Sequence, residues 1–383
     1  MMTLIQRERL AETFTQLCEI SSPSRREKEI ADHLKQVFTD LGANAIIEDN
    51  SATATGSESG NLIFRFDGNR PDVEGVFFSC HMDTVQPGDG VEVDRKGDIF
   101  TSRGETILGG DDKSGIAAII EMMTLLTENN IDHGLIEIVI TTCEEIGLLG
   151  AKHLEHRLLK AKYGYALDSS GIDKVIIGAP SANKFKIIVT GAAAHAGLNP
   201  EQGISAIQVA AEAITKVQLG RLDEESTANF GIIGGGVATN IVPEQVTIEG
   251  EVRSHSSEKL AHYTAEIKRV FEATVADWQT SPENTLRPKV QIEALSEYPA
   301  MLLSMDSPVI RRVRSAGESI GKNINFVVAG GGSDANIFNG FGLPTAIIAT
   351  GMDKVHTTDE QLDLNDLVSV TELISTVAVQ LTH

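Results

Sequence analysis

Apolar residues in the first 180 positions are spaced alternately as in helices and as in strands. The spacing is helical over residues 4–41, interrupted at residues 21–24, which predicts two helices. A wide apolar stripe predicts a strong helix over 112–128, and another helix is expected to begin within 150–156. Short apolar runs predict strands at 61–66, 76–80, 135–142 and 165–167. This alternation favours an α/β sheet with helices on both faces.

After Pro180 the order of the predicted elements changes. Strands are expected at 184–190, 228–233, 245–253 and 290–298, and helices at 204–217 and 257–278. The order β-α-β-β-α-β is that of a ferredoxin-like unit. After Pro299 the first pattern resumes, with a helix at 308–320 and strands at 326–329 and 345–349. We therefore expect a mixed-sheet α/β domain made of residues 1–180 and 300–383, interrupted by an α+β insert at 181–299.

Bulk properties narrow the class of protein. A chain of 383 residues is too long for one ordinary core, which agrees with two domains. The formal charge of −22 disfavours nucleic acid and anionic membranes as partners, because both are bound through basic patches. No apolar run approaches a membrane span, and the N-terminus lacks a signal-peptide pattern, so we expect a cytoplasmic protein. Cys18, Cys80 and Cys143 do not form a metal-knuckle pattern, and reduced thiols are expected.

Candidate chemistry gathers at the ends of the predicted strands. His81 and Asp83 follow the 76–80 run, and alternate side chains of a strand share a face. This places a possible metal ligand beside a carboxylate that can orient its ring. Further candidates end other apolar segments, namely Asp111-Asp112, Glu144-Glu145, Asp168 and His356. Two histidines with several acids suit zinc or another borderline divalent ion, so the sequence predicts a hydrolytic metal centre.

Each motif also has a plain structural explanation. A lone histidine at a strand end is more often only hydrogen-bonded, and an aspartate before a helix can be a cap. Two adjacent acids at Asp111-Asp112 exceed what a cap needs, and one carboxylate has two oxygens with which to bridge two ions. At Glu144-Glu145, like charges side by side cost free energy unless a cation or proton neutralises one. If one of these two acids is a ligand, its neighbour faces elsewhere and can be a base.

The predicted insert adds His195 among small residues at 191–197, which indicates either close approach by another molecule or a tight turn. Glycine runs at 234–236 and 330–332 are possible phosphate cradles. Neither has the Gly-Lys-Ser/Thr ending or the Gly-x-Gly-x-x-Gly spacing of nucleotide-binding loops. The sequence therefore disfavours a nucleotide site.

Taken together, these residues resemble the M20 family of dinuclear zinc peptidases, most closely its peptidase T-like, tripeptidase branch. The resemblance covers nearly the whole chain. It rests on eight matches in order, at 81–88, 110–115, 144–147, 168–169, 194–197, 240–243, Arg253 and His356.

The resemblance implies a site for two Zn²⁺ ions, with Co²⁺ or Mn²⁺ as alternatives. Asp111 would bridge both ions, Asp83 would orient His81, and Glu144 would be the general base. The implied metal ligands are His81, Asp111, Glu145, Asp168 and His356.

In the same way, the insert would be a lid that dimerises the protein. His195 would steady the oxyanion, either in its own chain or across a dimer. Asn240 and Arg253 would hold the substrate, Arg253 through two hydrogen bonds to a carboxylate, and Gly332 and Ser333 would touch it.

The implied activity is metal-dependent hydrolysis of amide bonds in short peptides. Three alternatives stay open from the sequence. The first is a deacylase or carboxypeptidase acting on N-acyl amino acids, which keeps the chemistry and also uses Arg253. The second is a non-catalytic metal- or peptide-binding protein, against which the intact Glu144 argues, and the third is nucleotide binding through the glycine runs.

Overall fold

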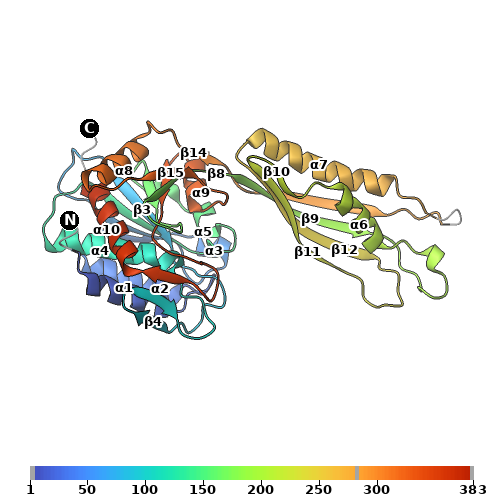
Figure 1. Cartoon of the computed structure of the whole chain (residues 1–383), viewed down its shortest axis with the longest axis horizontal. Coiled ribbons are helices and arrows are strands. Elements are labelled where there is room, and N and C mark those ends of the chain that lie inside the picture. The colour runs from blue at the N-terminus through green and yellow to red at the C-terminus, as the bar shows by residue number, and fades with distance from the viewer. Residues whose placement is uncertain (1–4, 281–283, 380–383) are drawn as a thin grey trace. The chain divides into compact units, whose positions relative to one another are not determined.

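The computed structural model describes residues 5–280 and 284–379, and the chain divides into two compact units (Figure 1). Unit 1 comprises Met1–Gly178, Leu302–Ala329 and Ser333–His383, and unit 2 comprises Ala179–Met301 and Gly330–Gly332. Residues 1–4, 281–283 and 380–383, which the predicted domain limits include, lie outside the described residues. The assignment of these parts as a catalytic domain and a lid stays a prediction.

Unit 1 is built on a nine-stranded mixed sheet. The strand order is β1-β2-β6-β3-β7-β16-β8-β14, and β15 pairs with β8. The strands are β1 Ala45–Glu48, β2 Leu62–Phe66, β3 Val76–His81, β6 Ile136–Thr141, β7 Gly164–Ala166, β8 Lys174–Ala179, β14 Met301–Leu302, β15 Asn325–Val328 and β16 Thr345–Ile348. Every residue of β3 and β6 is buried, and such strands give continuous apolar runs in the sequence. A smaller sheet has the order β17-β5-β4, from Gln361–Asp363, Ile99–Ser102 and Val93–Lys96.

Helices cover both faces of the large sheet. Phe77 and Phe78 are neighbours on β3 and therefore point to opposite faces. Phe77 packs edge-on against Phe338 of α9, whereas Phe78 stacks on Tyr165, whose hydroxyl donates to the carbonyl oxygen of Val309 in α8 at 2.6 Å. The helices of this unit are α1 Arg7–Glu19, α2 Lys28–Asp40, α3 Ala52–Thr55, α4 Gly110–Glu128, α5 Leu149–Lys152, α8 Pro308–Ser319, α9 Asp334–Gly340 and α10 Leu364–Val379.

Unit 2 is a five-stranded antiparallel sheet with two helices. The strand order is β10-β11-β12-β9-β13, and four of these strands with their helices follow the predicted ferredoxin-like path. Ile187, Val189 and Ile248 pack with Phe271 of α7 in its core. The elements are β9 Ser181–Thr190, α6 Ala206–Lys216, β10 Gly220–Asp223, β11 Ser226–Gly235, β12 Gln245–Ser254, α7 Ser257–Ala276 and β13 Lys289–Tyr298.

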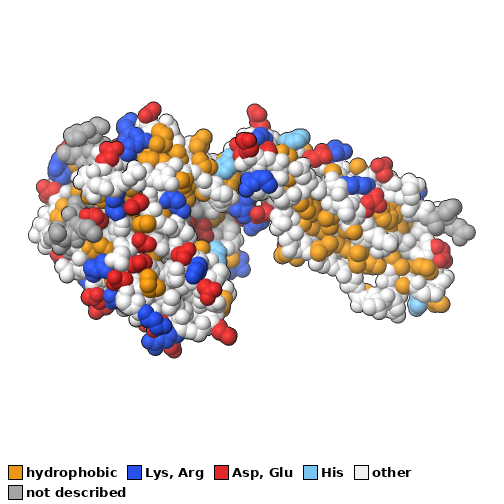
Figure 2. Space-filling model, in the orientation of Figure 1, with side chains coloured by type: hydrophobic (Ala, Val, Ile, Leu, Met, Phe, Trp, Pro, Cys, Tyr) orange, Lys and Arg blue, Asp and Glu red, His pale blue; other side chains and the backbone are white. Residues whose placement is uncertain are grey.

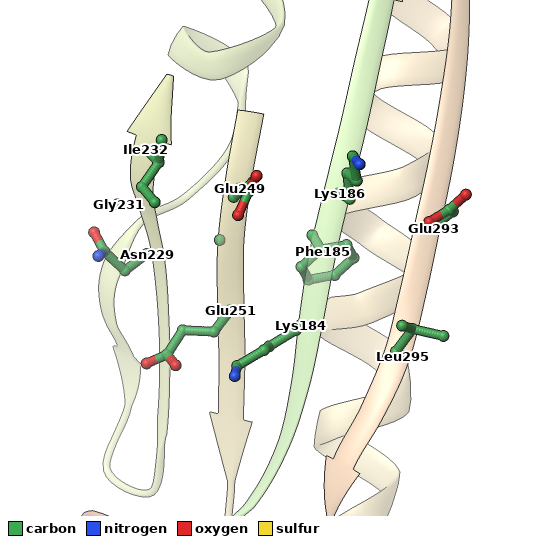
Figure 3. Close-up of a pocket in the computed structure, with 11 residues that line it drawn as sticks. Lys184, Phe185, Lys186, Asn229, Gly231, Ile232, Glu249, Glu251, Glu293 and Leu295 are labelled. Carbon is green, nitrogen blue, oxygen red and sulfur yellow. The ribbon is translucent and has the colours of Figure 1, made fainter. Parts of the chain in front are cut away.

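The face of this second sheet turned away from α7 carries a shallow hollow (Figure 3). Lysine and glutamate side chains of β9, β12 and β13 line it, with Ile232 and Leu295 at its sides. None of its 11 lining residues is a predicted site residue. The hollow is therefore a feature of the sheet and not of the predicted metal centre.

The predicted fold class, a mixed-sheet α/β domain plus a ferredoxin-like α+β insert, is confirmed. The sequence analysis did not predict β8 or the last helix, α10. Eleven residues of α10 are buried, among them Val370 and Ile374, so it lacks the polar face that marks an amphipathic helix. No helix within residues 5–280 and 284–379 is long and apolar enough to cross a membrane. The cytoplasmic location stays a prediction.

Candidate metal centre and substrate-binding residues

The predicted metal ligands meet at one edge of the large sheet because three neighbouring parallel strands end there. β6, β3 and β7 pair side by side, and His81 is the last residue of β3. Glu144 and Glu145 follow the end of β6, and Asp168 follows β7. Carboxyl ends of parallel strands are the usual place for sites in open α/β sheets.

The carboxylate of Asp111 lies between two imidazoles. Its Oδ1 is 3.1 Å from Nε2 of His81, and its Oδ2 is 3.1 Å from Nε2 of His356. The same nitrogen of His356 is 3.0 Å from Oε1 of Glu145. Asp111 thus directs one oxygen to each of two groups of nitrogen and oxygen donors, as a carboxylate that bridges two cations must.

These donors fit a metal ion. One ligand atom each from His81, Asp111 and Glu145 lies within 4.8 Å of the other two. The three side chains come from separate segments of the chain, and both His81 and Asp111 are buried. Two imidazoles with several carboxylates form the mixed nitrogen and oxygen set that zinc and similar ions prefer. The residues therefore support a divalent metal centre.

Asp168 and Glu144 complete the group of acids. Burial first, and the negative charge of Asp111 second, raise the pKa of Asp168 to about 7. Burial also raises the pKa of Glu144 well above its usual range, although the charge of His81 opposes that shift. Carboxyl groups packed together disfavour the ionised form unless a cation is present. This electrostatic setting suits one acid as a ligand and another as a proton acceptor.

Asp83 contacts the site differently from what alternation along a strand suggests. β3 ends at His81, so Asp83 lies beyond the pleated part of the chain. Nδ1 of His81 is 2.9 Å from the backbone carbonyl oxygen of Asp83 and 3.6 Å from its carboxylate. The carboxylate instead accepts hydrogen bonds from the amides of Glu144 at 2.8 Å and Glu145 at 3.3 Å. It also accepts one from the hydroxyl of Ser24 at 2.6 Å. Asp83 therefore holds both the imidazole and the Glu144-Glu145 turn.

Two further acids at this edge were not among the predicted site residues. Glu27 is buried and accepts the amide of Cys143 at 3.1 Å and the hydroxyl of Ser57 at 2.6 Å. Asp334 begins α9, and its Oδ2 accepts a hydrogen bond from the hydroxyl of Thr141. Its Oδ1 has no hydrogen-bond partner among the described residues. Burial raises the pKa of Asp334 to about 6. Nothing in the local spacing marks Glu27, whereas Asp334 directly follows the glycine run and Ser333.

In unit 2, His195 and Asn240 lie on two paired segments. His195 pairs with Ile241, and the amide of Ala196 donates to the carbonyl oxygen of Asn240 at 2.9 Å. Nδ1 of His195 accepts the amide of Gly197 at 3.1 Å, and its ring is exposed. This fixes the ring at the end of the β9–β12 ladder.

Arg253 lies at the other end of that ladder. Arg253 pairs with Ala182, and Gln245 pairs with Thr190, so the two ends are eight residues apart, or about 26 Å along the strands. Nε and Nη2 of Arg253 bind the two carboxylate oxygens of Glu251 at 2.8 and 3.0 Å. The two predicted substrate-holding residues of one chain, Asn240 and Arg253, are thus far apart.

The predicted glycine contact lies beside Arg253. Gly332 packs so tightly on the Tyr298 ring that a Cβ atom would come within 2.3 Å of it. A Cβ on Gly331 would lie 3.7 Å from Nη1 of Arg253. Ser333 belongs to unit 1, where its hydroxyl accepts the amide of Ala335 at 3.3 Å and caps α9. Its side chain therefore has a structural role whatever else it contacts.

Comparison with known proteins places this chain in a family. Residues 77–380 match the model of peptidase family M20/M25/M40. The chain is 41% identical to the uncharacterized protein YqjE of Bacillus subtilis strain 168 over 97% of its own length and 98% of that protein. It also resembles Peptidase T of Enterococcus faecalis, at 22% identity over 96% and 95% of the two chains.

Two solved structures match nearly the whole chain. One is the aminopeptidase PepT of Bacillus cereus, with a TM-score of 0.88, 40% identity and 98% coverage of both chains. The other is a tripeptidase of Staphylococcus aureus, with a TM-score of 0.92, 35% identity and 98% coverage of both chains. Since the family model spans most of the sequence and the cluster of side chains that could hold a metal ion lies within it, the chain belongs to peptidase family M20/M25/M40 and is a metal-dependent peptidase.

Proposed function

We propose that this peptidase acts on short peptides as an aminotripeptidase-like exopeptidase. The observation that carries the proposal is the Asp111 carboxylate, whose two oxygens face two different imidazoles. The similarity to an aminopeptidase and to a tripeptidase, at 40% and 35% identity, supports the choice of short peptides as substrates.

The proposed cofactor is a pair of divalent ions, zinc in the first place, with cobalt or manganese as alternatives. His81 and Asp168 would bind one ion, Glu145 and His356 the other, and Asp111 both. Such a pair, when bound, activates a water molecule and polarises the scissile carbonyl group. The mixed imidazole and carboxylate donors support zinc over magnesium or calcium, which prefer oxygen ligands alone.

Glu144 is the proposed general base. It takes the proton of the attacking water and later gives that proton to the leaving amine, so its own protonation is unchanged after one turnover. Its raised pKa supports this role, because a carboxylate with a higher pKa is a stronger base. Asp83 holds the backbone amide of Glu144 and so keeps the base in place.

We also propose that the protein is a homodimer through unit 2. A tripeptide spans at most about 11 Å, whereas the β9–β12 ladder separates Gln245, at the end next to Asn240, from Arg253 by about 26 Å. If Asn240 and Arg253 both hold one substrate, they must come from two chains. His195 shares the Asn240 end of the ladder, so in this arrangement the partner chain would provide His195 for the oxyanion. Mixing inactive His195→Ala and Glu144→Gln chains should then restore part of the activity.

A deacylase or carboxypeptidase acting on N-acyl amino acids is the second candidate. Arg253 favours it as much as it favours a peptidase, because both kinds of substrate present a carboxylate. Its bidentate contact with Glu251 holds the guanidinium in one orientation, which suits a planar anionic group.

A substrate panel separates the two candidates. Purified protein, loaded in turn with zinc, cobalt and manganese, is assayed on trialanine, dialanine and N-acetylalanine. We expect trialanine to be cleaved fastest, from its N-terminus, and Glu144→Gln to keep its metal but lose about 10²–10⁴ in turnover. Cleavage of N-acetylalanine alone supports the deacylase. Metal uptake without cleavage of any compound would refute hydrolysis.

A further inference from the structure

Glu360 is a buried acid that makes three long-range hydrogen bonds to the loop at residues 108–111, whose last two residues begin α4 with a non-helical backbone at Asp111. Its Oε2 accepts the amides of Leu108 and Gly109, both at 2.8 Å, and its Oε1 accepts the amide of Asp111 at 3.0 Å. Only 1% of Glu360 is exposed, so these amides replace the water that a carboxylate would otherwise bind. Hydrogen bonds to an ionised acceptor are about twice as strong as neutral ones.

The loop that Glu360 holds is shaped around its carboxylate. Gly109 has a φ of 79°, a conformation that other residues rarely adopt. A Cβ atom on Gly110 would lie 3.2 Å from Oε1 of Glu360, closer than most side chains tolerate. The two glycines therefore allow the backbone to bend around the acid and to point three amides at it.

The same acid belongs to the loop that carries His356. The amide of Asp353 donates to the carbonyl oxygen of Gln361, and the amide of Gln361 donates to the carbonyl oxygen of Asp353, both at 3.0 Å. This pair of hydrogen bonds closes the loop from 353 to 361. Glu360 is therefore fixed next to the closing pair and four residues after His356. Nε2 of His356 lies 3.1 Å from Oδ2 of Asp111, so the two segments that Glu360 joins also meet through these side chains.

We propose that Glu360 is a positioning residue of the metal centre, which holds Asp111 in register with His356 and so sets the affinity for metal. The inference rests on the proposed binding of metal by Asp111 and His356. The Glu360 carboxylate bonds to the backbone amide of Asp111 and not to its side chain, so it acts through the backbone of that residue. The buried Lys113 provides a nearby positive charge that offsets the cost of burying the acid.

The test is Glu360→Gln in the full-length protein. Glutamine keeps the size of the side chain but turns one acceptor into a donor, which must then face an amide hydrogen. We expect zinc affinity, measured by calorimetric titration of metal-free protein, to fall roughly 10–100-fold. The visible absorption of the cobalt form should also change, because the ligand geometry changes. Asp359→Asn is the matched control, since it removes the same charge from an exposed neighbour and should leave both readings as in the wild type.

Wild-type zinc affinity and an unchanged cobalt spectrum in Glu360→Gln would overturn the inference. If that variant does not fold, Gly110→Ala replaces it, because the added Cβ presses on Oε1 while Glu360 stays in place. Gly110→Ala should bind zinc more weakly than the wild type, and equal binding would again overturn the inference. A wild-type protein that binds no metal would refute the proposed function instead, so the two failures are distinguishable.

Discussion

Asp83 accepts hydrogen bonds from the backbone amides of both Glu144 and Glu145. Its Oδ1 lies 2.8 Å from the amide nitrogen of Glu144, and its Oδ2 lies 3.3 Å from that of Glu145. One buried carboxylate thus fixes the backbone of the proposed base and of a proposed ligand. We predict that Asp83→Asn lowers kcat on trialanine about 10–100-fold, because the amide nitrogen of asparagine cannot accept a hydrogen bond. Steady-state kinetics and metal content measured together check this.

Ser24→Ala is the comparison for Asp83→Asn. It removes the hydroxyl that donates to Oδ2 of Asp83 at 2.6 Å but leaves both amide contacts intact. Its effect on kcat should be much smaller. An Asp83→Asn enzyme with the kcat of Ser24→Ala would show that the two amide contacts do not matter for turnover.

Glu27 supports the same turn through the amide of Cys143, the residue before Glu144. We predict that Glu27→Ala lowers the free energy of unfolding by about 1–3 kcal/mol, because it leaves a buried amide without a partner. Urea unfolding of the metal-free protein measures the loss. Glu29→Ala, an exposed change two residues away, should stay within about 0.5 kcal/mol of the wild type. Equal stability of the two variants would contradict this role of Glu27.

The sequence predicts the parts of this site that depend on patterns of neighbouring residues, and not the parts that depend on contacts between residues far apart in the chain. The apolar runs of β3 and β6 identify buried strands, and their ends bring His81 and Glu144 to one edge of the sheet. Glu27 and Glu360 give no such signal, because the site amides that they bind, that of Cys143 and that of Leu108, lie more than 100 residues away from them along the chain.

Asp83 shows a second limit of sequence reasoning. Its face was inferred from strand alternation, but the strand ends two residues earlier, and its carboxylate turns to the amides of the next loop. The pairing of Glu251 with Arg253, in contrast, follows from their spacing of two on β12 and could have been predicted.

Metal binding should depend on pH through His356. Hydrogen bonds to Asp111 first, and to Glu145 second, raise the pKa of His356 to about 10 in the metal-free site. The imidazole is therefore protonated at neutral pH and must lose its proton before it can bind a cation. Below pH 10 this one group should weaken zinc binding about tenfold for each unit that the pH falls.

Zinc titrations at pH 6.5, 7.0 and 7.5 measure this dependence. His356→Ala should bind zinc more weakly overall and release one proton fewer per zinc pair, a number that calorimetry in buffers of different ionisation enthalpy gives directly. His262→Ala, on the exposed side of α7, should release as many protons as the wild type. Equal proton release by the wild type and His356→Ala would contradict the assignment of His356 as a ligand.

The contact between Glu251 and Arg253 should set the affinity for substrate rather than the rate of the chemical step. Glu251 holds Nε and Nη2 of the guanidinium, so the arginine that is proposed to bind the carboxylate of a substrate is already oriented. Glu251→Gln loses one of these two charge-assisted bonds. We predict an increase in KM for trialanine of about tenfold, equivalent to about 1.4 kcal/mol, with kcat within about twofold of the wild type. Trialanine amide, which lacks the terminal carboxylate, should show a much smaller change.

Glu249→Gln provides the control variant. Glu249 lies two residues from Glu251 on the same face of β12 and lines the hollow on that face of the sheet (Figure 3). If Glu251→Gln raised KM equally for the acid and the amide, Arg253 would not be reading the carboxylate.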